Sequence, residues 1–332
     1  MTIFEVMKAI VSVIIPAFNE QRNIARAIKS VLAQSFCDFE LIVVDDASTD
    51  GTLATVESLA ATDSRISVIV HDTNHGLSQS RLNGVKAAQG EYVFFLDADD
   101  YITTEALELL TDKATTSQCD IVIAGAQRVS RRLHIPMPFL IPSRILTNEI
   151  YSTRSLLPLM LDKISFPLNA WGRLYRRTVL AEKFICAEKN FMGEDMILNI
   201  RVFAADARLA WIDNNIYHWT MGGGSSHSPK QSWQHNLDLY YRCREVLNQL
   251  NEHTPQNLAA LDNGLKNDLI TSTARMLGNP LKSRAKTLEW VDQQLPLTHL
   301  AGLTSDDIMA KARKHLSRHC RFYLAVQLLS RL

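Results

Sequence analysis

The sequence predicts an α/β fold: a mostly parallel sheet flanked by helices, followed by a helical C-terminal region. Three observations predict it. Short apolar, β-branched runs alternate with segments of helical spacing over residues 11–125. The runs are apolar throughout, as in strands that are covered on both faces. After a glycine-rich segment at 222–226, the pattern is helical only.

Four strands and three helices are expected in alternation before residue 97. The predicted strands, each a compact apolar run, are 11–15, 41–44, 66–70 and 92–96. The predicted helices, which lie between them, are 23–33, 52–61 and 77–89. Parallel sheets bind ligands beyond the carboxyl ends of their strands. Polar clusters stand at three such ends: 16–20, 45–50 and 97–100.

The pattern loosens after a further predicted strand at 120–125. Residues 126–150 indicate a hairpin or an irregular excursion. The next segments are predicted as a turn, a helix and a strand, at 171–177, 191–205 and 209–220. Because glycine and serine runs break regular structure, 222–226 marks the expected boundary. We therefore expect a catalytic domain over 1–225, with halves 1–125 and 126–225, and a helical region over 226–332.

Composition excludes several classes of protein. The chain has 332 residues, 46% of them hydrophobic, with 35 Lys and Arg against 35 Asp and Glu. A net charge of zero argues against a nucleic-acid partner held by a global basic field. The five scattered cysteines lack a C-x-x-C pair, which favours reduced thiols in a cytoplasmic protein. No run reaches the roughly 18–20 apolar residues of a membrane-spanning helix, and the N-terminus lacks a signal-peptide pattern.

Three carboxylates follow the fourth predicted strand in the run Asp97-Ala98-Asp99-Asp100. They repel one another, and a divalent cation would relieve that repulsion and bridge to phosphate oxygens. A solvated acidic turn is the alternative. A calcium loop is another, although Ile102 stands where such a loop needs glycine.

The segment 46–57 matches a calcium-loop pattern more closely. An EF-hand needs a helix before its loop, however, and a strand is predicted there. We therefore expect a strand-to-helix turn. The chain carries neither G-x-G-x-x-G after its first strand nor G-x-x-x-x-G-K-[ST]. Carboxylates stand where those folds place glycine-rich phosphate loops, so a metal between protein and pyrophosphate is expected.

Several runs together resemble the family 2 glycosyltransferases with the GT-A fold, of the bacterial surface-glycan type. The matching runs, in the order and spacing of that family, are VSVIIPAFNE (11–20), SVLAQSF (30–36), FELIVVDDASTDGT (39–52), NHGL (74–77), Arg81 with Asn83 and Gly84, and GEYVFFLDADD (90–100). The match covers about residues 10–110 and weakens towards residue 220.

The resemblance implies roles on the nucleotide side. Three residues after the first strand would line the base and ribose: Pro16, Phe18 and Glu20. Phe18 stands where the family usually has tyrosine, so a hydroxyl contact is lost while the ring remains. Asp46 would read the edge of uracil or an equivalent base. The wall around the nucleotide and donor sugar would include Asn74, Gly76 and Arg81, and a helix-surface ion pair is the alternative for Arg81.

The resemblance also implies a metal and a base. Asp97, Ala98 and Asp99 match the D-x-D motif: Asp99 would bind Mn²⁺ or Mg²⁺, and Asp97 the ribose or a metal-bound water. The pair Glu194-Asp195 matches the position of the general base. An acceptor hydroxyl has a pKa far above 7, so a carboxylate must take its proton. Asp195 is the predicted base, and Glu194 is the second candidate or an acceptor contact. The alternative is that Asp195 is a helix N-cap.

Other candidates belong to the acceptor side and the second half. Trp171 would either stack on a sugar ring or pack in the core. His218 would supply a further metal or phosphate contact, or be structural. A loop with Ser225, Ser226 and His227 would close over the pyrophosphate.

The combined prediction is an inverting, metal-dependent glycosyltransferase. It would move a sugar from a nucleotide-diphosphate sugar, with UDP expected, to a glycan or lipid-linked acceptor in cell-surface polysaccharide synthesis. The alternative is a catalytically silent sugar-nucleotide-binding or scaffold protein. Residues 311–332 carry six Lys or Arg and no acid, together with an apolar side. They would either bind the inner face of the membrane peripherally or pack on the catalytic domain as a terminal helix.

Overall fold

The computed structural model describes residues 10–130, 136–137, 149–163, 166–183, 193–221, 229–277, 304, 307–308 and 310–312. The strands are β1 (Val11–Ala17), β2 (Phe39–Asp45), β3 (Ile66–Val70), β4 (Tyr92–Phe95), β5 (Tyr101–Ile102), β6 (Ile121–Ser130), β7 (Pro136–Met137), β8 (Ile150–Ser152), β9 (Arg173–Arg176) and β10 (Arg208–Met221). The helices are α1 (Ile24–Leu32), α2 (Thr52–Ala60), α3 (Leu77–Ala87), α4 (Ala106–Ser117), α5 (Thr153–Leu161), α6 (Arg177–Lys183), α7 (Glu194–Phe203), α8 (Pro229–Gln249) and α9 (Pro255–Leu277).

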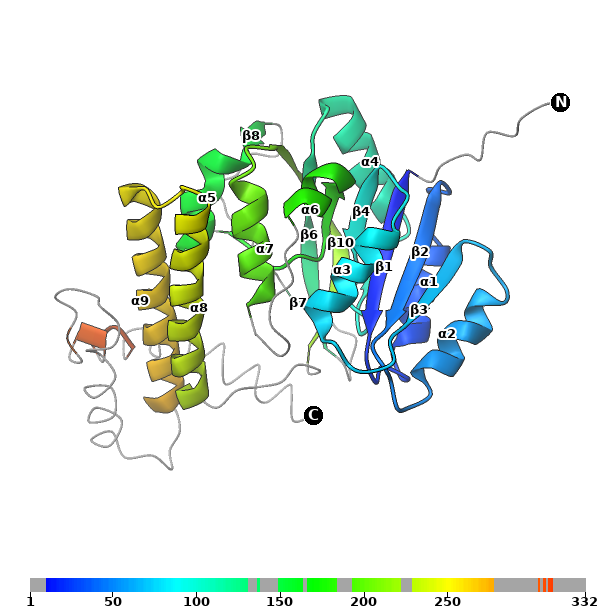
Figure 1. Cartoon of the computed structure of the whole chain (residues 1–332), viewed down its shortest axis with the longest axis horizontal. Coiled ribbons are helices and arrows are strands. Elements are labelled where there is room, and N and C mark those ends of the chain that lie inside the picture. The colour runs from blue at the N-terminus through cyan, green and yellow to red at the C-terminus, as the bar shows by residue number, and fades with distance from the viewer. Residues whose placement is uncertain are drawn as a thin grey trace. The chain divides into compact units, whose positions relative to one another are not determined.

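A central sheet has the strand order β3-β2-β1-β4-β9-β6-β10-β5, with β7 on β6 and β8 on β10 (Figure 1). The four strands β3, β2, β1 and β4 are parallel to one another. β1 lies between β2 and β4, so the strand order reverses there. In parallel sheets, ligands bind beyond the carboxyl ends of the strands at such a reversal. The loops after β1, β2 and β4 therefore frame the candidate site.

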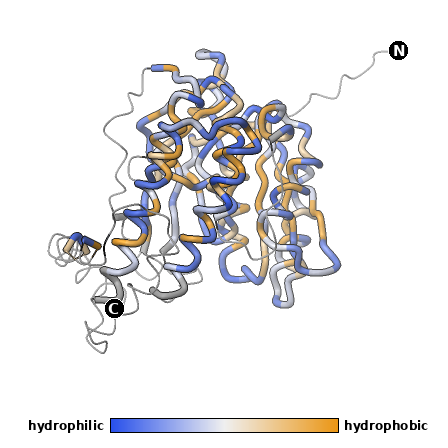
Figure 2. The backbone as a smooth tube through the Cα atoms, turned by 60° about the vertical axis from the view of Figure 1, so that its left-hand side comes forward, coloured by the Kyte–Doolittle hydropathy of each residue, from blue (hydrophilic) through white to orange (hydrophobic). Residues whose placement is uncertain are grey.

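The first strand shows why this half folds as predicted. All seven residues of β1 are buried. Val13 and Ile15 belong to the core that includes α1, while Ile14 lies against Gly84 of α3, where an added Cβ would come within 2.4 Å. Helices therefore cover both faces of the sheet, and hydrophobic stretches are visible along its strands (Figure 2). The predicted strands and helices before residue 97 are confirmed, within one to three residues at most ends.

One prediction for the second half is wrong. Residues 173–176 form β9, an antiparallel strand between β4 and β6, and not part of a turn. Arg173 in this strand is fully buried and donates a hydrogen bond to Oδ1 of Asn199 at 2.7 Å. Its partner lies 26 residues away in the sequence. The sequence of this four-residue strand, which contains two arginines, therefore did not indicate that it is buried. The predicted strands at 120–125 and 209–220 are β6 and β10. In 126–150, the described part of the predicted excursion includes β7 and the start of β8.

The chain divides into two compact units. One comprises Met1–Leu157 with Leu168–Gly223, and the other comprises Pro158–Pro167 with Gly224–Leu332. The second unit contains the paired helices α8 and α9. Gly264 of α9 passes so close to the Leu161 carbonyl that a Cβ would lie 2.3 Å from its oxygen. The helical region predicted after residue 226 is present in α8 and α9, while 278–303 and 313–332 lie outside the described residues.

None of the helices in the described ranges is both long enough and apolar enough to cross a membrane.

Candidate functional site

The acidic turn after β4 divides its three carboxylates between two tasks. Asp100 is fully buried, and it accepts hydrogen bonds from the Tyr217 hydroxyl at 2.8 Å and the Thr220 backbone N–H at 2.7 Å. The same hydroxyl accepts a hydrogen bond from the backbone N–H of Asp97 at 3.1 Å. Burial, with the charges of Asp97 and Asp99, raises the pKa of Asp100 to about 8. Asp100 anchors the turn on β10, and Asp97 and Asp99 remain half-buried at the site.

A buried arginine joins this turn to the Glu-Asp pair. Arg81 of α3 is 2% exposed. Its Nη2 donates to Oδ1 of Asp97 at 2.9 Å, and its Nη1 donates to Oδ1 of Asp195 at 2.6 Å. Oε1 of Glu194 lies 3.9 Å from the same Nη1. Burial lowers the pKa of the Arg81 guanidinium, but the three carboxylates outweigh it and the net pKa is raised. Arg81 is therefore the centre of a buried charge cluster, and the helix-surface ion pair is wrong.

The Glu-Asp pair opens α7. Gly193 is the N-cap, with a left-handed φ of 109°, so Asp195 is not the N-cap. Oδ2 of Asp195 accepts a hydrogen bond from the Ala170 backbone N–H at 3.0 Å, and both of its carboxylate oxygens are thereby oriented. Burial and the Asp195 charge raise the pKa of Glu194. Their side chains stay 20% and 23% exposed, so water or a ligand can reach both carboxylates.

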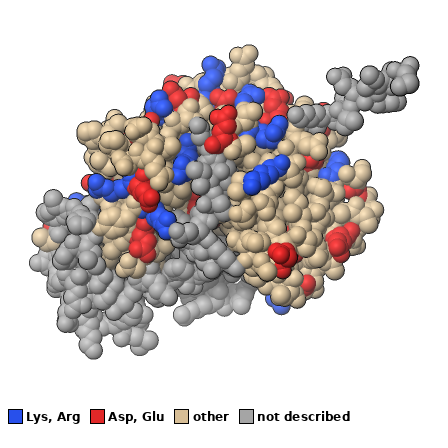
Figure 3. Space-filling view, viewed as in Figure 1, with Lys and Arg blue, Asp and Glu red and all other residues tan. Residues whose placement is uncertain are grey.

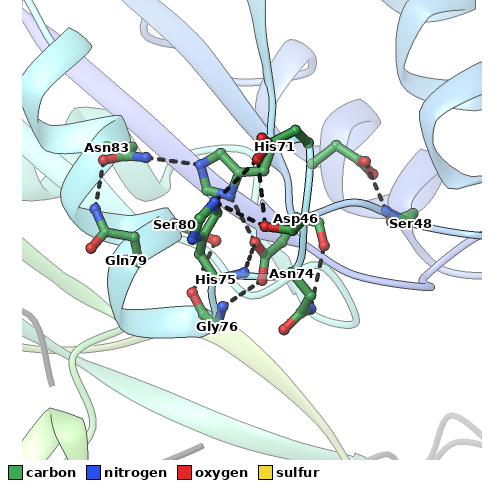
Figure 4. Close-up of polar contacts among 12 residues, drawn as sticks. Asp46, Ser48, His71, Asn74, His75, Gly76, Gln79, Ser80 and Asn83 are labelled. Atoms are coloured by element: carbon green, nitrogen blue, oxygen red, sulfur yellow. Dashed lines mark hydrogen bonds and ion pairs between the residues drawn. The ribbon is translucent and has the colours of Figure 1, made fainter. Parts of the chain in front are cut away.

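The loop that follows β3 is fixed on the carboxylate of Asp46, which is 3% exposed. Oδ1 of Asp46 is bonded to Nδ1 of His71 and accepts the backbone N–H of His75, each at 2.7 Å. Oδ2 accepts the backbone N–H of Gly76 at 2.7 Å (Figure 4). Asn74 donates from Nδ2 to the Asp46 carbonyl at 3.3 Å. The structure thus brings Asp46, Asn74 and Gly76 together, and their contacts with a nucleotide stay predictions.

Three candidates at the end of β1 differ in exposure. Pro16 is buried inside the strand opposite Val44, and its contact with the base and ribose stays a prediction. Phe18 is 45% exposed and presents its ring at the carboxyl edge. Glu20 is half-buried, and its Oε2 accepts a hydrogen bond from Nδ2 of Asn23 at 2.7 Å. Phe18 and Glu20 remain candidates for the base and ribose.

The segment 46–57 forms the predicted strand-to-helix turn. β2 precedes it, and Gly51 is the N-cap of α2. Asp50 accepts hydrogen bonds from the backbone N–H groups of Thr52 and Gln21. Its oxygens thus organise the turn, while those of Asp46 hold another loop, and the calcium-loop interpretation is wrong.

An aromatic cluster lies beside the Glu-Asp pair. The half-buried ring of Trp171 stacks on Tyr217 with centroids 4.2 Å apart, and Trp219 is 6.2 Å away. Ala170, the residue before Trp171, is the one that contacts Asp195. Trp171 is thus packed on one side, and its contact with a sugar stays a prediction.

His218 follows Tyr217 along β10, and successive side chains of a strand point to opposite faces. The His218 ring stacks on Tyr101, with centroids 4.5 Å apart. Burial lowers the pKa of the half-buried His218 imidazole, and its contact with a metal or a phosphate stays a prediction. The loop candidates Ser225, Ser226 and His227 lie outside the described residues.

The carboxylates of the turn fit a hard divalent cation. Over the described part of the chain, no three His, Cys, Asp or Glu side chains gather closely enough to hold a metal alone. Mg²⁺ usually takes one or two carboxylates and completes its shell with substrate phosphates and water. Asp97 and Asp99 would provide that donor set at one turn, and the role of His218 beside them stays a prediction.

Several contributors were not foreseen from the sequence. Tyr217 and Asp100 act through a side-chain contact across 117 residues, which no local pattern reports. Arg26 donates to the Asp99 carbonyl at 2.6 Å and to Oγ1 of Thr220 at 3.0 Å. His71 had one usable signal, because it stands directly after β3 at the ligand-binding edge of the sheet.

Comparison with known proteins agrees with this architecture. The family described as Glycosyl transferase family 2 matches residues 12–182. An uncharacterized glycosyltransferase of Bacillus subtilis, EpsJ, is 33% identical over 64% of this chain and 61% of its own length. A Campylobacter jejuni enzyme named GalNAc(5)-diNAcBac-PP-undecaprenol beta-1,3-glucosyltransferase is 42% identical over 31% of this chain and 34% of its own. This chain thus spans less than two thirds of either relative.

Among solved structures, Staphylococcus aureus TarS 1-349 in complex with UDP-GlcNAc is similar, with a TM-score of 0.59 and 20% identity. The match covers 92% of this chain and 91% of that one. At this identity the similarity concerns the fold, and it confirms the expected GT-A architecture.

Proposed function

Because the chain belongs to glycosyl transferase family 2, we propose that it transfers a sugar from a UDP-sugar to a hydroxyl of a glycan or lipid-linked acceptor in cell-surface polysaccharide synthesis. The observation that carries the proposal is the Arg81 cluster, which joins Asp97 of the D-x-D turn to the Glu194-Asp195 pair. A UDP-GlcNAc complex of TarS supports the donor, and the undecaprenol-linked substrate named for the Campylobacter relative supports the acceptor class.

The proposed reaction is a single displacement with inversion. Asp195 takes the proton of the acceptor hydroxyl. The hydroxyl oxygen bonds to the anomeric carbon while the bond between that carbon and the diphosphate oxygen breaks. Arg81 and the Ala170 N–H fix the orientation of the Asp195 carboxylate for this step. Mn²⁺ or Mg²⁺, held by Asp99 and Asp97, would neutralise charge on the departing diphosphate. Phe18, Glu20 and Asp46 would hold the nucleoside.

Glu194 is the second candidate for the base. Burial raises the pKa of its carboxyl, and a base is most efficient when its pKa approaches the working pH. Against this role, Oε2 of Glu194 accepts the Gly193 N–H at 3.0 Å, directed back towards its own helix start. Asp195 is therefore the proposed base and Glu194 a contact of the acceptor.

The test compares Asp195→Asn with Glu194→Gln. UDP release is followed over a panel of UDP-sugars, and UDP binding is measured by calorimetry. We expect Asp195→Asn to lower kcat by about 10²–10⁴-fold with UDP affinity nearly unchanged. Asp63→Asn, at a surface ion pair, is the control. Equal kcat values for Asp195→Asn and wild type would contradict the assignment. Binding of UDP without turnover of any sugar would favour the silent binding protein.

We further propose peripheral contact with the inner face of the membrane through residues 311–332, on the basis of their six Lys or Arg and apolar side chains. Of these residues, only 311 and 312 are among those the structure describes. Electrostatic attachment weakens as salt screens the charges. Co-sedimentation with anionic vesicles that persists unchanged at high salt would argue against it.

A further inference from the structure

A chain of hydrogen bonds runs from α3 to the carboxylate of Asp46 (Figure 4). Nε2 of Gln79 donates to Oδ1 of Asn83 at 2.8 Å. Nδ2 of Asn83 lies 2.8 Å from Nε2 of His71, and Nδ1 of His71 lies 2.7 Å from Oδ1 of Asp46. The side chains of His71 and Asp46 are only 6% and 4% exposed. Water is therefore largely excluded from the central bond.

The donor and acceptor of each hydrogen bond in this chain follow from the groups at its two ends, Gln79 and the Asp46 carboxylate. Oδ1 of Asn83 accepts from Gln79, so the amino group of Asn83 faces His71 and donates to Nε2. At the other end, an ionised carboxylate can only accept, so Nδ1 must carry the hydrogen. His71 is thus a neutral imidazole with its proton on Nδ1. Burial raises the pKa of Asp46, but the His71 hydrogen bond and the backbone N–H groups of His75 and Gly76 outweigh it, and the net pKa is lowered.

These hydrogen bonds leave the Asp46 carboxylate with a countable number of free acceptor positions. A carboxylate offers about four acceptor positions. Two on Oδ1 are used by His71 and His75, and one on Oδ2 is used by Gly76. One position is left, on Oδ2, as far as the described residues show. The ring nitrogen on the pairing edge of uracil carries a hydrogen, whereas that of cytosine does not, and the donor of cytosine is its 4-amino group. One fixed acceptor aimed at the ring nitrogen therefore suits uracil and faces a lone pair of cytosine.

We infer that His71 is a positioning residue for nucleotide binding: its Nδ1–H orients Asp46 so that Oδ2 presents one acceptor to a base N–H. The inference rests on the proposed function, because it concerns how the proposed donor is held. It assigns a role to a histidine outside the reacting cluster.

Two substitutions of His71 each retain one of its two hydrogen bonds, so they test the bond to Asp46 separately from the bond to Asn83. The amide nitrogen of His71→Asn can replace Nδ1 and keep the bond to Asp46. The longer His71→Gln can keep a partner for Asn83 but loses the bond to Asp46. Calorimetry should give UDP dissociation constants within about threefold of wild type for His71→Asn, and at least about tenfold weaker for His71→Gln, or about 1.4 kcal/mol. The preference for UDP over CDP should shrink in His71→Gln.

The matched controls are His253→Asn and His253→Gln, at an exposed histidine in the other unit, and both should bind UDP as wild type does. Equal weakening by His71→Asn and His71→Gln, or unchanged UDP binding in both, would overturn the inference.

A second measurement needs no variant and no nucleotide. Two-bond ¹H–¹⁵N correlation spectra of the wild-type protein distinguish the two neutral tautomers of histidine. We expect His71 to carry its proton on Nδ1. A proton on Nε2 would overturn the inference even if UDP binds. Absence of UDP binding by the wild type, with the Nδ1 tautomer present, would instead count against the proposed function alone.

Discussion

Arg81 has the most partners among the predicted reacting residues, because it is shared by carboxylates from the turn after β4 and from α7. The sequence left open whether Arg81 lines the donor site or forms a surface ion pair, because its partners Asp97 and Asp195 lie 16 and 114 residues away along the chain. The D-x-D and Glu-Asp motifs could be found from residue type and spacing. The resemblance also singled out Arg81, but its link between the two motifs could not be predicted, because a buried ion pair has no local signature.

Replacing Arg81 with Met tests this role. The change keeps volume but leaves Asp97, Glu194 and Asp195 as unpaired neighbours of like charge. Removing one partner of a buried ion pair costs about 3–5 kcal/mol. We expect urea denaturation to show a loss in the free energy of unfolding of this order for Arg81→Met.

Arg65→Met is the matched control, because Arg65 pairs with Asp63 at the surface, with side chains 33% and 22% exposed. Exposed pairs contribute about 1 kcal/mol or less. Equal losses for the two arginine variants would contradict the buried cluster.

The pKa of Asp100 predicts a pH dependence. Its folded value is about 8, against an ordinary value of 3.8. Between these limits the folded protein binds more protons than the unfolded chain, so the free energy of unfolding falls as pH rises. Asp100→Asn does not titrate, and its stability relative to wild type should increase from about pH 5 to about pH 8, by at most about 1.4 kcal/mol per unit. Urea denaturation in EDTA measures it.

Asp112→Asn, at an exposed position on α4, is the control for the Asp100 variant. Parallel stability curves for Asp100→Asn and wild type across this range would show that the Asp100 carboxyl does not titrate as its burial requires.

At the scale of elements, the first half was predictable because its strands are continuous apolar runs and its helices have one apolar face. β1 is buried along its whole length, so nothing in its sequence conflicts with its position. β9 was missed for the opposite reason. Its Arg176 donates hydrogen bonds to Asp120 and Glu91, and these partners lie 56 and 85 residues away. Polar strands are recognised only when their distant partners are known.

A prediction for α9 follows from Gly264. Alanine at an open helical position gains up to about 1 kcal/mol over glycine. At Gly264 the added Cβ would lie 2.3 Å from the carbonyl oxygen of Leu161, which is backbone and cannot rotate away. Gly264→Ala should therefore lower the free energy of unfolding by about 1–3 kcal/mol.

Asn263→Ala, at the exposed neighbouring position of α9, should be neutral or slightly stabilising. Thermal unfolding followed by circular dichroism compares the two. A higher Tm for Gly264→Ala would mean that α9 does not pass this close to Leu161.

At the scale of the whole molecule, charge is balanced and dispersed. The 35 basic and 35 acidic side chains give no net charge. On the face drawn in Figure 3, the Lys, Arg, Asp and Glu of the described residues are interspersed, without one large field of either sign. On the proposed function, recognition of a charged donor would therefore be local, at the acidic turn after β4 with a cation. Nucleotide binding would then depend on the metal.

The most direct measurement is calorimetric titration of UDP into the whole protein, with Mn²⁺ and again with EDTA, for wild type and Asp99→Asn. UDP needs no knowledge of the sugar or the acceptor. We predict binding by wild type in Mn²⁺, weakened at least about tenfold, or about 1.4 kcal/mol, by EDTA or by Asp99→Asn. UDP binding that is equally tight in all four conditions, or absent from all of them, would contradict a metal-assisted UDP-sugar site at this turn.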